Sequence, residues 1–195
     1  MNKNPLKAGI FGGTFDPVHL GHLITAQSLL LKRDLDRIIF IPCYISPHKT
    51  NKPASISIHR LNMIKLAIEG YDKFTFSDFE IAREGISYSI DTIMHLKEEY
   101  DELELIIGFD SLVTFDTWKE PDKITDLVKL VVMNRSHNAE IKNRNRFFER
   151  AVFVDTPVID ISATEIREKI KSKLPVNFLV PEKVLKYITD NGLYK

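Results

Sequence analysis

Lys7–His22 reads KAGIFGGTFDPVHLGH and predicts a buried strand that runs through a glycine turn into a helix. The short apolar run Lys7–Phe11 ends at Gly12-Gly13, and over Leu20–Leu31 the apolar residues recur at helical spacing. The two glycines let the backbone come close to a ligand and leave its N–H groups free to hold an anion. Because the positive end of the helix dipole faces the same turn, the stretch predicts a phosphate site at the end of the first strand.

The alternation of strand and helix continues along the chain. Further strand-like runs lie at Arg37–Ile41, Phe74–Phe76, Leu103–Ile107, Leu127–Met133 and Ala151–Val154, and helical periods at Ile58–Ile68, Ser89–Tyr100, Ser162–Lys171 and Glu182–Asp190. Apolar strands separated by helices are typical of a mostly parallel sheet with helices on both faces. We therefore expect a Rossmann-like, doubly wound α/β fold, with residues 1–195 as one domain and the helices from about residue 162 packed on it.

Composition and charge exclude several classes of protein function. The 195 residues carry 27 Lys and Arg against 27 Asp and Glu, which argues against a broad basic face for nucleic acid. The single cysteine, Cys43, excludes an intrachain disulfide and a multi-cysteine zinc site. No apolar stretch approaches the ~18 residues of a membrane span and no signal-peptide core is evident, so we expect a cytoplasmic protein without membrane or nucleic-acid partners. Whether it forms a homo-oligomer stays open.

His19 and His22 lie three residues apart at the start of the predicted helix, with Gly21 leaving space beside them. Two imidazoles over a glycine turn at a helix N-terminus suit a polyphosphate. The same spacing occurs at zinc sites, but a tetrahedral site needs three or four protein ligands and the sequence shows no obvious third. The Walker pattern and a clean G-x-G-x-x-G are both missing from the sequence.

The segment Gly12–His22 resembles the signature of the HxGH nucleotidyltransferase superfamily, whose members transfer a nucleotidyl group from a nucleoside triphosphate to a phosphate-bearing acceptor. Other segments, in the same order, are similar to those of bacterial nicotinate-nucleotide adenylyltransferases: Ser46-Pro47-His48-Lys49, Glu80–Thr92, Ile107–Asp110 followed by Trp118 and Lys119, Asp160–Arg167 and the C-terminal tail. The sequence departs from the family pattern at Ser46, Ser89 and Ala163.

The resemblance implies roles for individual residues. It assigns catalysis to His19, His22 and Arg167, which would neutralise phosphate charge rather than abstract a proton. The ATP-binding residues would be Gly12, Gly13, Thr14, Phe15, His19, Gly21, His22, Gly108, Asp110, Ser162 and Arg167. Those for nicotinate mononucleotide would be Gly13, Thr14, His48, Lys49, Ser89, Trp118 and Lys119. No residue is assigned to a resident metal ion, because Mg²⁺ would arrive bound to ATP.

Some of these residues also have local structural explanations. Ser87 or Ser89 is placed to cap the helix that follows, and Ser162-x-x-Glu165 is a capping box. A cap and a phosphate site are compatible, because both occupy the same end of a helix. A lone tryptophan such as Trp118 is commonly a core residue, although an indole also stacks well on a cationic pyridinium.

The implied reaction joins the AMP moiety of ATP to nicotinate mononucleotide and releases pyrophosphate. The acceptor phosphate, with a second pKa of ~6, is largely dianionic at neutral pH and needs no strong base. Catalysis would consist of positioning and charge neutralisation. Three alternatives stay open: an amide-preferring enzyme, a phosphopantetheine adenylyltransferase, which Trp118 and Ser87–Thr92 argue against, and a silent nucleotide sensor, which the intact histidine pair argues against.

Overall fold

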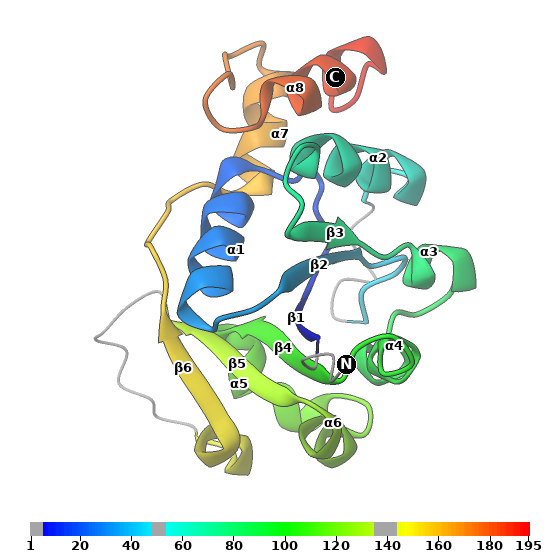
Figure 1. The fold of residues 1–195 in the computed structure, drawn as a ribbon. Helices are drawn as coiled ribbons and strands as arrows, with labels where there is room; N and C mark the ends of the chain where they lie inside the picture. Colours follow the sequence, from blue (N-terminus) through cyan, green and yellow to red (C-terminus); the bar gives the residue numbers. More distant parts are fainter. Residues whose placement is uncertain (1–5, 48–53, 135–143) are drawn as a thin grey trace.

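Six parallel strands form one sheet in the order β3-β2-β1-β4-β5-β6. They are seen in a computed structural model that describes residues 6–47, 54–134 and 144–195 (Figure 1). The strands are β1 (Lys7–Gly13), β2 (Arg37–Pro42), β3 (Phe74–Phe76), β4 (Glu102–Gly108), β5 (Lys129–Asn134) and β6 (Ala151–Asp155). This order confirms the predicted doubly wound α/β fold, and all five strand pairings are parallel where the sequence predicted a mostly parallel sheet.

The helices follow the predicted periods, except that the helix predicted over Ser89–Tyr100 ends at Leu96. There are also additions that the sequence did not indicate. The longer ones are α1 (Leu20–Lys32), α2 (Ser57–Ile68), α4 (Ser89–Leu96), α7 (Ala163–Lys171) and α8 (Glu182–Asp190). The unpredicted ones are the short α3 (Phe79–Arg83), α5 (Phe109–Val113) and α6 (Pro121–Leu127) and the 3₁₀ turns η1 (Phe115–Thr117) and η2 (Arg146–Arg150). The strand predicted over Leu127–Met133 was wrong at its start, because Leu127 ends α6 and Val128 caps it.

Successive strand residues point to opposite faces of the sheet and build two separate cores. Ile38 and Phe40 join the core beneath α1, α2, α7 and α8, whereas Ile39 and Ile41 join the core beneath α4 and α6. Figure 1 shows these two groups of helices on opposite sides of the sheet. Both strand faces are buried, which explains the uninterrupted apolar runs in the sequence.

The strand order reverses between β1 and β4, and this is where a doubly wound sheet opens a crevice for a ligand. The register places Phe11 beside Ile106, so the two strands end together two residues later, at Gly13 and Gly108. The topology therefore brings the predicted phosphate turn and the predicted nucleotide segment to one edge of the sheet.

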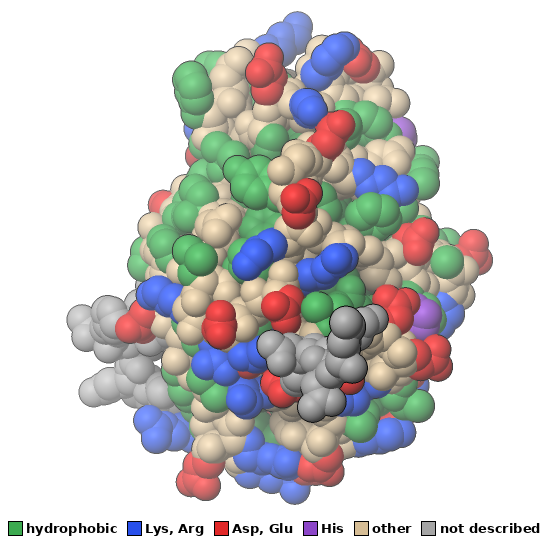
Figure 2. All heavy atoms as spheres, viewed as in Figure 1, with side chains coloured by type: hydrophobic (Ala, Val, Ile, Leu, Met, Phe, Trp, Pro, Cys, Tyr) green, Lys and Arg blue, Asp and Glu red, His purple; other side chains and the backbone are tan. Residues whose placement is uncertain are grey.

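Charges of both signs are interspersed over the face of the molecule seen in Figure 2. This agrees with the formal net charge of zero. Among the helices of the described residues, none combines the length and apolarity needed to cross a membrane.

Candidate active site

His19 and His22 meet at the N-terminus of α1. His19 is the N-cap, with an extended backbone (φ −141°, ψ 169°), and the two rings stack with centroids 3.6 Å apart and planes 27° from parallel. The backbone N–H of His19 donates a hydrogen bond to Nδ1 of His22 at 3.2 Å. Because Nδ1 of His22 is an acceptor, a neutral His22 ring carries its proton on Nε2, where it can be donated to a ligand.

Small residues make room for this pair. A Cβ built on Gly21 would lie 3.0 Å from Nδ1 of His19 and 3.1 Å from its Cε1, so any side chain there would press on the ring. A Cβ on Gly13 would meet the ring of Phe15 at 3.0–3.3 Å, whereas Gly12 faces open space within 4 Å. A ligand can therefore approach the backbone at Gly12 on that side. The predicted turn at Gly12-Gly13 was wrong, because both glycines belong to β1 and pair with Ile41 and Pro42 of β2.

Phe15 is the most strained residue of the first loop. Its backbone has φ 50°, in the left-handed region that non-glycine residues avoid, and its side chain is 3% exposed. The ring packs edge-on against His22, with centroids 4.9 Å apart. Phe15 thus acts as a packing residue against His22, one ring of the stacked pair.

The fold brings Arg167 from α7 to this same loop. Its Nη1 donates to the backbone carbonyl of Asp16 at 2.7 Å, and its Nη2 donates to the hydroxyl of Thr164 at 3.2 Å. At the start of α7, the Ser162 hydroxyl accepts from the N–H of Glu165 at 3.1 Å. The capping role predicted for Ser162 is confirmed, and the two motifs lie side by side through a contact between Asp16 and Arg167, 151 positions apart in the sequence.

Behind the loop, Asp16, Ser55, Arg60 and Tyr194 form a polar network that the sequence did not indicate. Asp16 and Arg60 are buried, and Ser55 and Tyr194 are half-buried. Arg60 is 1% exposed and donates to three backbone carbonyls: Nη1 to Thr14 at 2.9 Å, Nε to Ser55 at 3.0 Å and Nη2 to Tyr44 at 3.3 Å. The Tyr194 hydroxyl donates to Oδ1 of Asp16 at 2.7 Å. Burial, together with the Asp16 carboxylate, raises the pKa of Tyr194 far above its usual value.

The residues predicted to contact the nicotinate ring lie after β4 and at the start of α4. Trp118 packs on the buried Phe115, with ring centroids 5.0 Å apart, and is itself half-buried. Lys119 lies over the ring of Tyr88 at 4.7 Å and forms an ion pair with Asp91 at 3.2 Å. The indole therefore lies against the core, as the packing explanation for Trp118 predicts, and Lys119 belongs to a charged cluster beside the start of α4.

The predicted capping of α4 by Ser87 or Ser89 was wrong. Tyr88 is the N-cap residue and makes no side-chain cap bond, while Ser89 is the first helical residue. The Ser87 hydroxyl accepts instead from the N–H of Tyr44 at 2.9 Å and ties this segment to the end of β2. The Ser87 hydroxyl thus accepts from the distant backbone N–H of Tyr44 and not from a backbone N–H in the first turn of α4. A sequence pattern cannot show such a long-range partner.

Glu80 is a buried carboxyl beneath the same segment. It is 8% exposed and accepts a hydrogen bond of 2.6 Å from the Thr92 hydroxyl. Burial raises the pKa of Glu80, against the opposing effect of the hydroxyl groups of Thr92 and Ser87. Through its hydrogen bond to Thr92, Glu80 therefore fixes the first part of α4 against α3.

Gly108 and Asp110 lie at the carboxyl end of β4. Gly108 ends the strand and is the N-cap of α5, and Asp110 is exposed in the first turn of that helix. His48 and Lys49, which belong to a segment similar to that of the family, lie outside the described residues.

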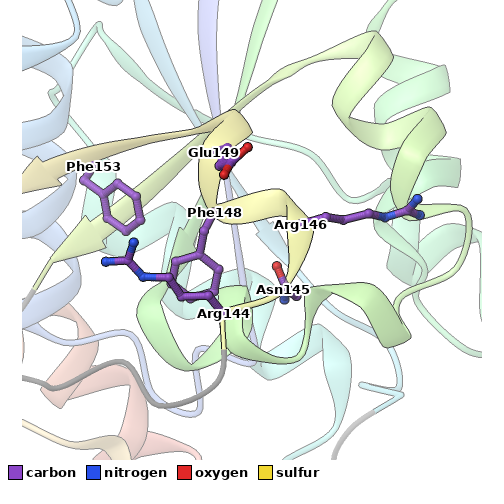
Figure 3. A pocket seen from close by; sticks show the side chains of 6 residues that line it. All are labelled: Arg144, Asn145, Arg146, Phe148, Glu149 and Phe153. Carbon is purple, nitrogen blue, oxygen red and sulfur yellow. The ribbon is translucent and has the colours of Figure 1, made fainter.

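A separate pocket beside η2 and β6 contains none of the predicted site residues. It is lined by Arg144, Asn145, Arg146, Phe148, Glu149 and Phe153, and Figure 3 shows Arg144 and Phe148 lying toward Phe153 while Arg146 points away. Within residues 6–47, 54–134 and 144–195, no group of three or more His, Cys, Asp and Glu residues is placed to hold a metal ion.

A doubly wound sheet has stacked histidines at its first helix and an arginine from a later helix at the same loop, which is the arrangement expected from the resemblance to nucleotidyltransferases. The model of the cytidylyltransferase-like family matches residues 10–169. The nicotinate-nucleotide adenylyltransferase of Bacillus subtilis is 41% identical over 192 residues, covering 97% of this chain and 98% of that protein. The chain therefore belongs to the cytidylyltransferase-like family and, within it, to the nicotinate-nucleotide adenylyltransferases.

Solved structures support the fold. Nicotinic acid mononucleotide adenylyltransferase of Plasmodium falciparum, complexed with APC, superposes with a TM-score of 0.74 at 18% identity, covering 97% of each chain. The same protein complexed with NaAD gives a TM-score of 0.74 at 20% identity over the same share of both chains. At this identity the likeness concerns the fold, whereas the family membership follows from the bacterial relative.

Proposed function

We propose that the residues at the ends of β1 and β4 and at the start of α7 bind ATP and nicotinate mononucleotide and align them for adenylyl transfer. As a nicotinate-nucleotide adenylyltransferase, the chain forms nicotinate adenine dinucleotide in NAD biosynthesis. The observation that carries the assignment of the site is the stacked pair His19 and His22, with Arg167 brought to the same loop through the Asp16 carbonyl.

In the proposed mechanism, a phosphate oxygen of nicotinate mononucleotide attacks the α-phosphorus of ATP and pyrophosphate leaves. His22 donates from Nε2 to an α-phosphate oxygen, because its Nδ1 is already occupied by the His19 amide. His19 and Arg167 take up charge on the α-phosphate and on the leaving pyrophosphate. No side chain needs to remove a proton from the acceptor, since its phosphate is already ionised at neutral pH.

On the acceptor side, Ser89, Trp118 and Lys119 are proposed to surround the nicotinate ring. The ion pair between Lys119 and Asp91 anchors this segment, and Tyr88 beneath the ammonium group adds an aromatic face. Backbone N–H groups here would make charge-assisted hydrogen bonds to the nicotinate carboxylate. A carboxamide would leave one such donor poorly paired, which costs about 1–3 kcal/mol and favours the acid.

Magnesium enters this proposal as part of the substrate Mg·ATP. The described residues offer no cluster of carboxylates that could hold the ion by themselves, and Mg²⁺ is commonly held by nucleotide phosphates with few protein ligands. Its charge would help to neutralise the triphosphate. The homo-oligomer and the cytoplasmic location considered from the sequence stay predictions.

The test is to incubate the purified chain with Mg·ATP and either nicotinate mononucleotide or its amide, and to separate dinucleotide and pyrophosphate by chromatography. We expect product from both, with a strong preference for the acid. Equal rates would contradict the recognition of the carboxylate but keep the reaction class. No product from either, while ATP still binds, would favour the silent nucleotide sensor.

A further inference from the structure

The segment Thr14–Asp16 joins the glycine turn to His19, and donors from three distant parts of the chain hold its last residue. Tyr194 donates to Oδ1 of Asp16 at 2.7 Å, and the Ser55 N–H donates to Oδ2 at 3.1 Å. Arg167 donates to the Asp16 carbonyl at 2.7 Å. Asp16 is 5% exposed and its three donors are half-buried, and hydrogen bonds to a charged group that is shielded from water in this way are strong.

Arg60 holds the same segment from the side of α2. Its guanidinium donates to the carbonyls of Thr14 and Ser55, and the N–H of Ser55 in turn donates to Asp16. These hydrogen bonds, together with the backbone from Thr14 to Asp16, form a closed ring that starts and ends at Arg60 and passes through Ser55. Because the guanidinium is planar and almost fully buried, it fixes the positions of these carbonyls relative to one another.

The shape of the segment indicates why it needs such support. Phe15, between the two anchored residues, has the left-handed backbone at φ 50°, which persists only where surrounding contacts impose it. Asp16 is followed after two residues by His19, whose own N–H orients His22. A shift of the anchored segment would therefore reach both histidines.

We propose that Tyr194 and Arg60 are positioning residues for the adenylyl transfer, and that the C-terminal end of the chain is thereby a working part of the active site. Neither side chain needs to touch substrate: both act by fixing Thr14–Asp16 and, through it, His19 and His22. The inference rests on the proposed roles of the two histidines. It extends the site to a residue 172 positions beyond His22, next to the last residue of the chain.

A second tyrosine provides a matched control. Tyr187 lies in α8, is half-buried, and its hydroxyl bonds to Nδ2 of Asn62 at 3.0 Å and to Nδ1 of His59 at 2.9 Å, both on α2. Tyr187→Phe and Tyr194→Phe each remove one hydroxyl that joins the C-terminal region to the body of the fold. Within the described residues, the hydroxyl of Tyr194 and not that of Tyr187 bonds to Asp16.

The experiment compares both variants with the native chain by steady-state kinetics, thermal unfolding and hydrogen exchange of the amides of residues 14–22. We expect Tyr194→Phe to lower kcat about tenfold with both KM values within about twofold, since small misplacements of catalytic groups are costly. The two variants should have the same Tm, and Tyr187→Phe should keep the native kcat. In Tyr194→Phe the amides of residues 14–22 should exchange faster than in the native chain. Equal kcat in the two variants overturns the proposal, as does a loss of kcat that merely follows the fraction unfolded.

Hydrogen exchange separates this inference from the proposed function. If the native chain makes no product, the proposed function fails, but exchange still reports on the anchored segment. Faster exchange confined to residues 14–22 in Tyr194→Phe would then support the positioning role, and unchanged exchange there would overturn it.

Discussion

Gly21→Ala should lower kcat while leaving the free energy of unfolding nearly unchanged, because the added methyl group would displace the His19 ring without disrupting the fold. The new Cβ would lie 3.0 Å from Nδ1 of His19 and 3.1 Å from Cε1, and the His22 ring is stacked at 3.6 Å. Apolar atoms prefer separations of about 3.5–4.0 Å, so the His19 ring has to move by about 0.5 Å. His19 is 6% exposed, and its neighbours restrict where the ring can go.

The size of the effect follows from this displacement. A misplacement of about 1 Å costs about 10²-fold in rate, so half of that corresponds to about tenfold in kcat, or about 1.4 kcal/mol of transition-state stabilisation. Gly21 is the second residue of α1, and alanine is favoured over glycine by about 1 kcal/mol in a helix interior, so that part of this gain is expected in the first turn. This gain offsets the tight contact, so the free energy of unfolding should stay within about 1 kcal/mol of the native value.

The assay measures kcat with saturating substrates and the free energy of unfolding from urea titration. Ser28→Ala, two turns further along α1, is the control for helix propensity and should leave kcat unchanged. Native kcat in Gly21→Ala would refute the view that the glycine is there to seat the His19 ring. A drop in kcat accompanied by an equal loss of folded protein would refute it as well.

Three further substitutions test other parts of the molecule. His22→Ala should lower kcat by about 10³-fold in the adenylyl-transfer assay, the cost of losing one donor to a charged transition state, with the circular dichroism spectrum unchanged; a near-native kcat would remove His22 from the mechanism. Arg60→Met leaves three carbonyls without their donor and should lower the free energy of unfolding by about 3 kcal/mol or more in urea titration; a loss below about 1 kcal/mol would mean that water replaces the guanidinium. Burial alone would raise the pKa of Glu104, but the hydrogen bonds and charges of Arg33 and Lys7 outweigh it and hold that pKa below its usual range. The stability that this carboxylate contributes is therefore complete above its unfolded pKa of about 4.3 and is lost as pH falls through the lower folded pKa. The difference in free energy of unfolding between the native chain and Glu104→Gln should accordingly be smaller at pH 3 than at pH 6. A difference that does not change with pH would contradict the ion pair.

The sequence predicted those parts of the fold whose signals are local and repeated. β1 and α1 were placed within two residues, because an apolar run, a glycine pair and a helical period follow one another closely, with only Thr14–His19 between the glycines and the helix. The short α5 and α6 escaped prediction, since five or seven residues carry too little periodicity. The start of β5 was misplaced for the same reason, because the apolar Leu127 and Val128 end a helix that has no strong pattern of its own.

The candidate site divides in the same way. The histidine pair and Arg167 are side chains in recognisable motifs, and the structure places them at one loop. The fate of Ser87 could not be predicted, since its partner is the backbone N–H of Tyr44, and every residue except proline carries such a group. A motif shows which side chains are present, but not which distant backbone groups they meet.

Arg60 shows where a signal existed and was missed. It occupies the buried face of α2 with Leu61, Met63 and Ile64, so an arginine stands among apolar residues at helical spacing. A charge in that position is costly unless every donor is satisfied, and this requirement alone points to a set of acceptors inside the fold. The acceptors turn out to be the carbonyls of Thr14, Tyr44 and Ser55, in the segments that follow β1 and β2. A buried arginine near a predicted site is therefore a reason to look for loops that it holds, even where it matches no catalytic motif.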